Sequence, residues 1–326
     1  MSDFSTRPMT REDAMAVNDL LAAAEAVDHT DEHYNVADVL EDFDNPMIEP
    51  AKDWLLVERD GIVIAHSRLL PRAPSQASLS VAVDGTVHPA YRGRGIGTHL
   101  VSALVARARD YVRERGEDLR PIITGSAPSD NTDVASIFDR SGLRPERFSF
   151  VMMADLKDGP LEPPPELLPG YTLHTWEGID HDEIREAHNE AFVGHYGWSP
   201  WSAEMWTQWV ADSRSLRPRL SLLARDRAGA IAAYIETGEF VAVQEATGIR
   251  EAFVVKVGTS PRHRRRGLAG VLLRIALARY RDDGFDRAAL DVDSENATGA
   301  LGIYERAGFR TDMRWTSYRL EESPGG

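Results

Sequence analysis

The chain has 326 residues, a formal net charge of −15 at pH 7 and a hydrophobic content of 42%. This length is about twice that of a typical domain, so we expect two domains with their own apolar cores. The negative charge argues against nucleic acid as a partner, because neutralised phosphates supply most non-specific affinity there. The chain has no cysteine, which excludes disulfides, thiolate metal sites and a cysteine nucleophile.

No apolar run approaches the roughly 20 residues that a membrane span needs. The first residues also lack the basic-then-apolar pattern of a signal peptide. We therefore expect a cytoplasmic protein with no membrane partner and no metal centre. Lysine is nearly absent, so arginine carries almost all of the positive charge.

The first half of the chain predicts helices alternating with strands. Thr10-Arg-Glu-Asp13 has the form of a capping box, and a second helix should begin at Asn35 and end before Pro46. The turn Arg59-Asp-Gly61 should join two strands as a hairpin. The expected helices are 14–27, 35–45, 98–115 and 133–141, and the expected strands are 54–58, 62–66, 79–87 and 122–124.

A proline-rich spacer at residues 157–169 separates this half from a second copy of the same plan. Two short motifs recur: Arg92–Gly97 returns as Arg264–Ala269, and Ile137–Gly142 returns as Ile303–Gly308. We therefore predict an internal duplication. Its expected parts are a first domain at 1–156, the linker at 157–169 and a second domain at 170–326. The second copy should contain helices 180–192, 202–210 and 271–280 and strands 221–224, 231–235, 251–257 and 288–292.

The motif Arg264-Arg-Arg-Gly-Leu-Ala269, here called the second arginine corner, should lie between a strand and a helix. Backbone N–H groups at a helix N-terminus bind phosphates well, and arginine adds charge-assisted hydrogen bonds. Gly267 and Ala269 would let the backbone approach the phosphates. A glycine turn with a solvated arginine face explains one motif equally well. Its recurrence as the first arginine corner, residues 92–97, favours a binding site.

The second arginine corner is followed, after a helix and a strand, by Asn296 and then Tyr304-Glu-Arg-Ala-Gly-Phe309. In this order the motifs resemble the GNAT superfamily of acyl-CoA-dependent N-acyltransferases. The resemblance covers nearly the whole chain in two copies. It implies an α/β (α+β) fold of two tandem GNAT-type domains, each a mixed, mostly antiparallel sheet flanked by helices. It also implies acetyl-CoA as the co-substrate.

By the same resemblance, the pantetheine arm pairs with the strand before each corner, much as an added strand would. The cofactor-binding residues implied in the second domain are Val255, Lys256, Val257, Arg262, Arg264, Arg265, Arg266, Gly267, Leu268, Ala269, Gly270 and Asn296. Those implied in the first domain are Thr86, Val87, Arg92, Gly93, Arg94, Gly95, Ile96 and Gly97. Two have simpler explanations: Lys256 could snorkel from a strand, and Asn296 could cap a helix.

Two residues of the second domain are candidate catalysts. Amide formation needs a neutral amine, and Glu251 at the start of its strand could act as the base. The chain resembles the tandem-domain mycothiol synthases, which implies a base at this strand position; a solvated glutamate is the alternative. Tyr304 could protonate the departing thiolate, or it could be a core aromatic. Phe138 replaces this tyrosine in the first domain, which we therefore expect to be catalytically degenerate.

The acceptor is less well specified. Aromatic residues between 188 and 209 suit a small-molecule pocket, although the same tryptophans could be core. Ile235-Glu-Thr-Gly238 lacks the lysine that mycothiol synthases use near their substrate. We expect a monomer that acetylates a primary amine of a small molecule by direct transfer in a ternary complex. A non-catalytic acyl-CoA-binding regulator is the main alternative. A protein acetyltransferase would need an open, peptide-width groove.

Overall fold

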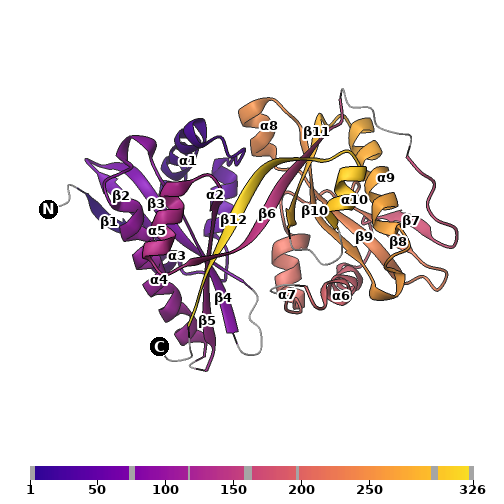
Figure 1. The fold of residues 1–326 in the computed structure, drawn as a ribbon, viewed down its shortest axis with the longest axis horizontal. Coiled ribbons are helices and arrows are strands. Elements are labelled where there is room, and N and C mark those ends of the chain that lie inside the picture. The colour runs from indigo at the N-terminus through magenta and orange to yellow at the C-terminus, as the bar shows by residue number, and fades with distance from the viewer. Residues whose placement is uncertain are drawn as a thin grey trace. The chain divides into compact units, whose positions relative to one another are not determined.

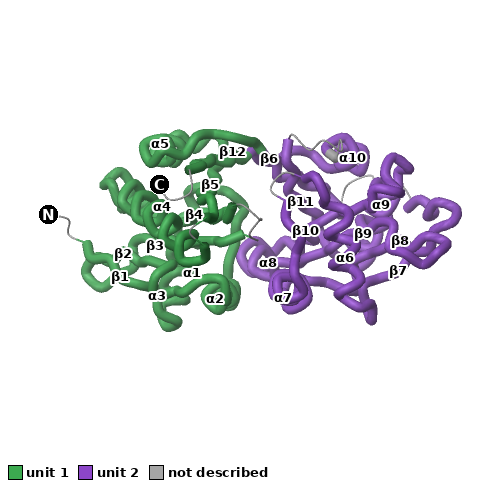
Figure 2. The backbone as a smooth tube through the Cα atoms, turned by 90° about the horizontal axis from the view of Figure 1, so that it is seen from below, with its two compact units in different colours: residues 1–148, 315–326 green, residues 149–314 purple. Residues whose placement is uncertain are grey.

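The computed structural model describes residues 4–72, 78–116, 118–157, 164–195, 198–294 and 300–322. The chain forms two compact units, the first made of residues 1–148 with 315–326 and the second of residues 149–314 (Figure 2). None of the helices within the described ranges is long and apolar enough to cross a membrane.

The first unit is a mixed sheet covered by helices. Its strands, in sheet order, are β1 (Ser5–Pro8), β2 (Trp54–Arg59), β3 (Ile62–Pro71), β4 (Ser78–Val87), β5 (Arg120–Pro128) and the part of β12 (Arg310–Glu321) from Trp315 onward. Its helices are α1 (Ala14–Asp28), α2 (Val36–Phe43), α3 (Pro50–Asp53), α4 (Ile96–Arg115) and α5 (Thr132–Arg140), with short 3₁₀ turns at Arg11–Asp13 and Pro89–Tyr91. Neighbouring strands are antiparallel except β4 and β5.

The predicted start of the second helix is confirmed. Asn35 is the N-cap of α2: its side chain accepts hydrogen bonds from the backbone N–H groups of Ala37 and Asp38. Asp38 returns a hydrogen bond to the Asn35 backbone, which completes the capping box. This arrangement satisfies N–H groups that have no partner inside the helix.

The second unit repeats the plan (Figure 1). Its strands, in sheet order, are the part of β6 (Arg144–Asp155) from Ser149 onward, β11 (Arg287–Asp293), β10 (Glu251–Thr259), β9 (Ile231–Gly238), β8 (Leu222–Arg225) and β7 (Thr172–Thr175). Its helices are α6 (His181–Phe192), α7 (Ala203–Trp206), α8 (Val241–Thr247), α9 (Leu268–Asp282) and α10 (Ala300–Arg306), with a π-helical turn at Thr207–Ala211 and a 3₁₀ turn at Pro261–His263. Among the strands described in this unit, β10 and β11 are the one parallel pair.

Helices cover both faces of the second sheet. Ile235 of β9 belongs to the apolar core that α9 closes, whereas its neighbour Tyr234 packs with residues of α6 and α7. Successive residues of a strand point to opposite faces. The α9 face and the α6 face are therefore the two sides of one sheet.

The compact units differ from the division expected from the sequence. Strand β6 follows the first repeat, yet its residues 149–155 pair with β11, and Met152 is buried in the second unit's core. Strand β12 ends the second repeat, yet its residues 315–321 pair with β5, and the Tyr318 ring lies 5.0 Å from that of Phe138. The sequence pattern revealed neither strand. Each unit thus contains one strand from the other repeat, and the boundaries do not fall at the predicted linker.

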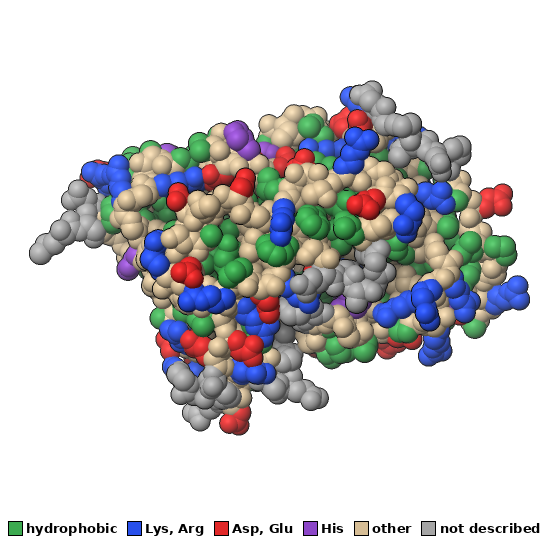
Figure 3. All heavy atoms as spheres, viewed as in Figure 1, with side chains coloured by type: hydrophobic (Ala, Val, Ile, Leu, Met, Phe, Trp, Pro, Cys, Tyr) green, Lys and Arg blue, Asp and Glu red, His purple; other side chains and the backbone are tan. Residues whose placement is uncertain are grey.

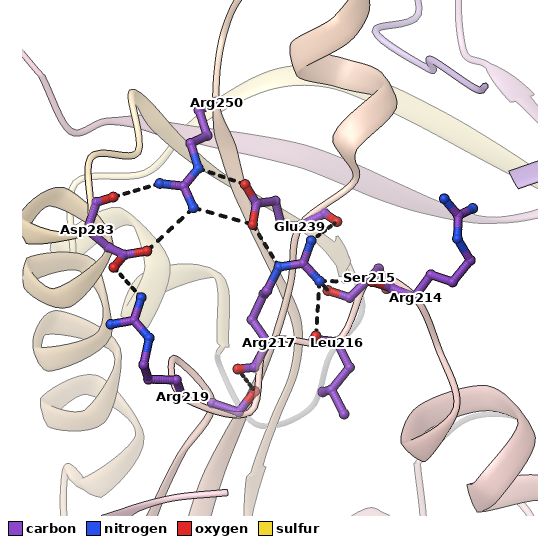
Figure 4. Close-up of polar contacts among 9 residues, drawn as sticks. Arg214, Ser215, Leu216, Arg217, Arg219, Glu239, Arg250 and Asp283 are labelled. Atoms are coloured by element: carbon purple, nitrogen blue, oxygen red, sulfur yellow. Dashed lines mark hydrogen bonds and ion pairs between the residues drawn. The ribbon is translucent and has the colours of Figure 1, made fainter. Parts of the chain in front are cut away.

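A network of ion pairs holds the loops at the start of β10 (Figure 4). Glu239 accepts from Arg250 Nε and from Arg217 Nε, each at 2.7 Å. Arg250 Nη2 also lies 3.4 Å from an Asp283 oxygen, and Arg219 pairs with the same carboxylate. Burial opposes ionisation of Glu239, but the two arginines outweigh it and lower its pKa. The network joins the turns that follow β9 and α9.

Candidate functional site

The sheet of the second unit opens between its two parallel strands. Pairing of β10 with β11 ends at Phe253 and Ala289, although β10 continues to Thr259 and β11 to Asp293. On its other side, β10 shifts register against β9 between Val254 and Lys256, which marks a bulge. A bulge bends its strand. Because β10 stays paired with β9 up to Thr259, the sheet opens between β10 and β11.

A cavity of about 1340 Å³ occupies this region. Its walls come from the end of α6, from β10, from the second arginine corner and α9, from the end of β11 and from α10. Val255, Lys256 and Val257 line it, as do Tyr304 and the predicted cofactor-binding residues from Arg262 to Gly270. The structure therefore brings these predicted residues together. Asn296 lies outside the described residues.

The second arginine corner has a backbone suited to anions. Arg265 and Gly267 both have positive φ, 59° and 81°, and Gly267 is the N-cap of α9. The first corner alternates in the same way, with Gly93 at 73° and Gly95 at 81°. Such turns aim successive N–H groups at one point, and the helix N-terminus adds positive potential. A Cβ added at Gly267 would meet nothing within 4 Å, so glycine is needed here for its backbone conformation.

Arg264 has a structural role in addition to lining the cavity. Its guanidinium donates to the carbonyl oxygens of Thr259 at 3.3 Å and Ala191 at 2.7 Å, so it joins the end of α6 to the end of β10. The equivalent Arg92 donates to Val87 O at 3.0 Å and pairs with both oxygens of Asp28 at 2.6 Å. The first arginine of each corner is therefore committed to protein contacts, which the motif alone did not reveal.

The second and third arginines of the second corner are exposed and accessible to a ligand. Figure 3 shows basic side chains on the surface of both units. Arg266 donates to the Tyr171 hydroxyl at 3.2 Å, and that hydroxyl lies 2.9 Å from Nδ1 of His263. Asp226 lies 3.3 Å from the other nitrogen of this imidazole. Sequence reasoning missed Tyr171 and Asp226, because no local motif links them to the corner.

Tyr304 and Glu251 lie in different environments. Tyr304 lines the cavity, and its hydroxyl has no hydrogen-bond partner among the described residues. Burial raises its pKa to about 12, so the phenol stays protonated at neutral pH. Glu251 is 7% exposed, its carboxylate accepts from Arg287 Nε at 2.5 Å, and it is not among the residues that line the cavity.

A different titratable group, His195, does line the cavity. It follows α6, and its ring lies 4.8 Å from that of Phe192. Burial and the charge of Arg264 lower its pKa, with Asp293 opposing. The imidazole is therefore neutral near pH 7. The sequence placed this residue in the aromatic acceptor segment but offered no signal that distinguished it.

The first unit has the corner, with Phe138 at the place of Tyr304. Thr86 and Val87 end β4, and Ile96 and Gly97, the last two residues of the first corner, begin α4. Phe138, at the place of Tyr304, is 4% exposed. A Cβ at Gly125 of β5 would lie only 2.6 Å from the tip of its ring. The phenylalanine thus packs directly on a strand of this unit's core.

The second unit thus combines a splayed parallel strand pair, an arginine corner at a helix N-terminus and a phenol that lines the cavity, and the first unit repeats the corner. The model of the acetyltransferase (GNAT) family matches residues 15–117 and 181–309, and the chain belongs to this family. It is 31% identical over 324 residues to a mycothiol acetyltransferase of Nocardia farcinica, with 95% of each chain covered. It is 29% identical over 280 residues to one of Salinispora arenicola, covering 82% of this chain and 80% of the relative.

Solved structures of acetyltransferases show the same fold. A GCN5-related N-acetyltransferase from Sphaerobacter thermophilus superposes with a TM-score of 0.77 at 29% identity, covering 100% of this chain and 98% of the other. A tandem GNAT protein from the clavulanic acid biosynthesis pathway has a TM-score of 0.69 at 19% identity, with 99% and 100% covered, and shows the fold. The predicted tandem GNAT fold is confirmed. The protein is an N-acetyltransferase with acetyl-CoA as its co-substrate.

Proposed function

We propose that the second unit transfers the acetyl group of acetyl-CoA directly to a primary amine of a small molecule within a ternary complex. The cavity is the observation that carries this proposal, because one space is bounded by the arginine corner, the opened strand and Tyr304. The diphosphate would lie at the N-terminus of α9 and the pantetheine along Val255–Val257. Holding both reactants in one cavity removes much of the entropic barrier.

The chemistry needs one proton donor and one proton acceptor. The neutral amine attacks the thioester carbon, the carbon–sulfur bond breaks, and the departing thiolate takes a proton from Tyr304. The nitrogen gives up its extra proton to a base. A phenol with a raised pKa suits the donor, because it is fully protonated before the thiolate forms.

Two residues, Glu251 and His195, are candidates for the base. Glu251 is the residue implied by resemblance, and it would need to act through water because its carboxylate is held by Arg287. His195 lines the cavity and is neutral near pH 7. A base must be within reach of the proton, directly or through one water. Position therefore favours His195, and Glu251 in this proposal secures the start of β10.

A small acceptor is supported by the α6 side of the cavity, where Ala191, Phe192 and His195 form the wall. Compact apolar walls with few polar groups are typical of small-molecule sites. The relatives named mycothiol acetyltransferase also point to a small acceptor. The segment Ile235–Gly238 lacks the lysine that mycothiol synthases use near their substrate, so the acceptor here differs in this proposal. The first unit, with Phe138 packed on β5, has a structural role.

Calorimetry with acetyl-CoA and a thiol-release assay over a panel of small primary amines test the proposal. We expect saturable binding and amine-dependent release of CoA, with mass spectrometry showing one acetyl group on the amine. Absence of binding heat would overturn the proposal. Binding without thiol release across the panel would instead support a non-catalytic regulator, and acetylation of peptides alone would indicate a protein acetyltransferase.

A further inference from the structure

We propose that Lys256, held by Glu236, is the residue that selects the acceptor, and that the acceptor carries a carboxylate close to its reactive amine. The inference rests on the proposed function and adds the chemical class of the substrate. Neither a recurring motif nor family resemblance assigns these two residues to acceptor recognition.

The two residues form a buried ion pair across neighbouring strands. Lys256 of β10 lies opposite Glu236 of β9, and its Nζ donates to Glu236 Oε2 at 3.2 Å. Glu236 is 4% exposed, and Lys256 is its only side-chain partner among the described residues. Burial raises the pKa of Glu236 and the lysine opposes this shift. Removing either partner would leave a buried charge without compensation.

Lys256, rather than Glu236, faces the cavity. Lys256 lines it, and Glu236 does not. The ammonium lies 4.9 Å from the centroid of the Trp201 ring, on the α6 face of the sheet with Tyr234. The corner that would bind the diphosphate begins α9, which packs on the opposite face. An amine that approaches the thioester from the α6 face therefore meets this ammonium.

The chemistry of the lysine defines the group that it would recognise. An ammonium has three N–H donors and no acceptor. One is used on Glu236, and no other described residue accepts a hydrogen bond from Lys256. A carboxylate would satisfy the remaining donors and add charge attraction in a desolvated site. A second ammonium or a bare alkyl group would leave them unsatisfied.

The first unit supplies an independent comparison. Asp84 stands eight residues before Arg92, as Lys256 stands eight residues before Arg264. Asp84 lies opposite Arg68 of β3 and accepts from its Nε at 3.0 Å, so the same strand positions hold an ion pair with reversed charge. The Arg68 cation also lies 4.9 Å from a tryptophan ring, that of Trp54.

Either polarity of the pair is therefore compatible with this strand arrangement. Both units place two opposite charges at these positions, and the cation is on a different strand in each. In the catalytic unit the cation is on β10, beside the cavity. The acceptor that enters the cavity is the physical reason that we assign to this choice.

The test compares matched acceptors in the full-length protein. Glycine, β-alanine and 4-aminobutanoate are each assayed against their primary amides by thiol release. The wild-type protein should prefer each acid over its amide by at least about tenfold in kcat/KM. The double variant Glu236→Lys with Lys256→Glu keeps an ion pair but reverses the charge at the cavity, and it should favour the amides. Glu236→Gln with Lys256→Gln serves as a second variant in case the reversed pair does not fold.

The control exchanges a pair outside the cavity: Glu183→Arg with Arg225→Glu reverses the ion pair between α6 and β8 and should leave the preference unchanged. Thermal melting and calorimetry with CoA establish that each variant folds and binds the cofactor. The inference is overturned if the wild-type protein uses acids and amides equally, or if both charge-altered variants keep the wild-type preference. In either case, amine-dependent thiol release would still support the proposed function. If no amine releases CoA, the proposed function fails and this inference falls with it.

Discussion

The hydroxyl of Tyr304 reaches the cavity without a partner in the described part of the chain. A core aromatic, the alternative explanation of this residue, would be closed off from the cavity. The ring contacts Phe309 edge-on, with centroids 6.1 Å apart, and Tyr304 lines the cavity. Packing thus positions the ring, and no described residue competes for the hydroxyl.

Tyr304→Phe should lower kcat roughly 10²-fold, because the thiolate would depart without a nearby acid. Affinity for CoA should be largely kept, since the change removes one oxygen. Because burial raises the pKa of Tyr304 to about 12, this group should cause no fall in rate below about pH 10. Steady-state kinetics and calorimetry measure both effects, and unchanged turnover would remove the acid role.

His195→Asn and Glu251→Gln distinguish the two candidate bases. The pKa of His195 is lowered below its ordinary 6.5, so the wild-type rate should fall only as pH drops through that lower value. His195→Asn should reduce kcat by about 10² and remove this acidic limb. Glu251→Gln should mainly reduce stability, by about 2 kcal/mol, because it weakens the contact with Arg287. A larger loss of kcat in Glu251→Gln than in His195→Asn would restore Glu251 as the base.

Among the structural elements, the arginine corner serves two purposes. In the proposed function its backbone binds the diphosphate at the start of α9, and its first arginine, Arg264, donates a hydrogen bond to the end of α6. The first unit has a corresponding contact, in which Arg92 pairs with Asp28 at the end of α1. The second and third arginines are exposed.

Arg266→Glu should weaken CoA binding by about tenfold with little change in melting temperature, because the charge near the diphosphate is reversed. Arg264→Gln should lower the melting temperature in addition to the affinity for CoA, since the variant loses the hydrogen bonds to Thr259 and Ala191. Calorimetry and thermal melting of the two variants separate these roles. Full CoA affinity after both changes would show that the diphosphate binds elsewhere.

Glu239→Gln tests the network at the start of β10. The pKa of Glu239 is lowered, so its contribution to stability is complete above the unfolded value and is lost as pH falls through the folded one. We expect the variant to be about 2 kcal/mol less stable at pH 7. The difference from the wild-type protein should shrink on acidification below pH 4.5. Urea unfolding at several pH values measures this difference in the free energy of unfolding. A difference that does not change with pH would show that the ion pairs of Glu239 are not its cause.

At the scale of the whole molecule, each compact unit depends on a strand from the other repeat. Met152 belongs to the first repeat but is fully buried in the second unit. Tyr318 belongs to the second repeat but packs in the first unit, beside Phe138. A cut at the proline-rich spacer would consequently remove a strand from both sheets.

Met152→Ala and Tyr318→Ala should each destabilise the unit in which the side chain packs, by about 2–5 kcal/mol. Hydrogen exchange should therefore increase in β11 for the first variant and in β5 for the second. Leu301→Ala, in a half-buried site of α10, is the milder comparison. Faster exchange confined to the repeat that carries the substitution would contradict the strand assignment.

Much of the fold was predictable because its signals are local. The cap at Asn35, the hairpin turn at Arg59–Gly61 and the glycine that begins α9 depend on a few neighbouring residues and their backbone preferences. The repeated corner also located one wall of the cavity. These features can be recognised in the sequence because each depends on contacts within one turn or one hairpin.

The strand exchange, the use of Arg264 as a tie, the pairing of Glu251 with Arg287 and the Lys256–Glu236 pair were not predictable. Each joins residues that are far apart in the chain, and periodicity specifies which face a strand buries, not which strand it meets. Local patterns were enough to predict the duplication, the family and the conformation of the corners. Which charges pair became known from the tertiary structure, because each pair joins residues on elements that are distant in the chain.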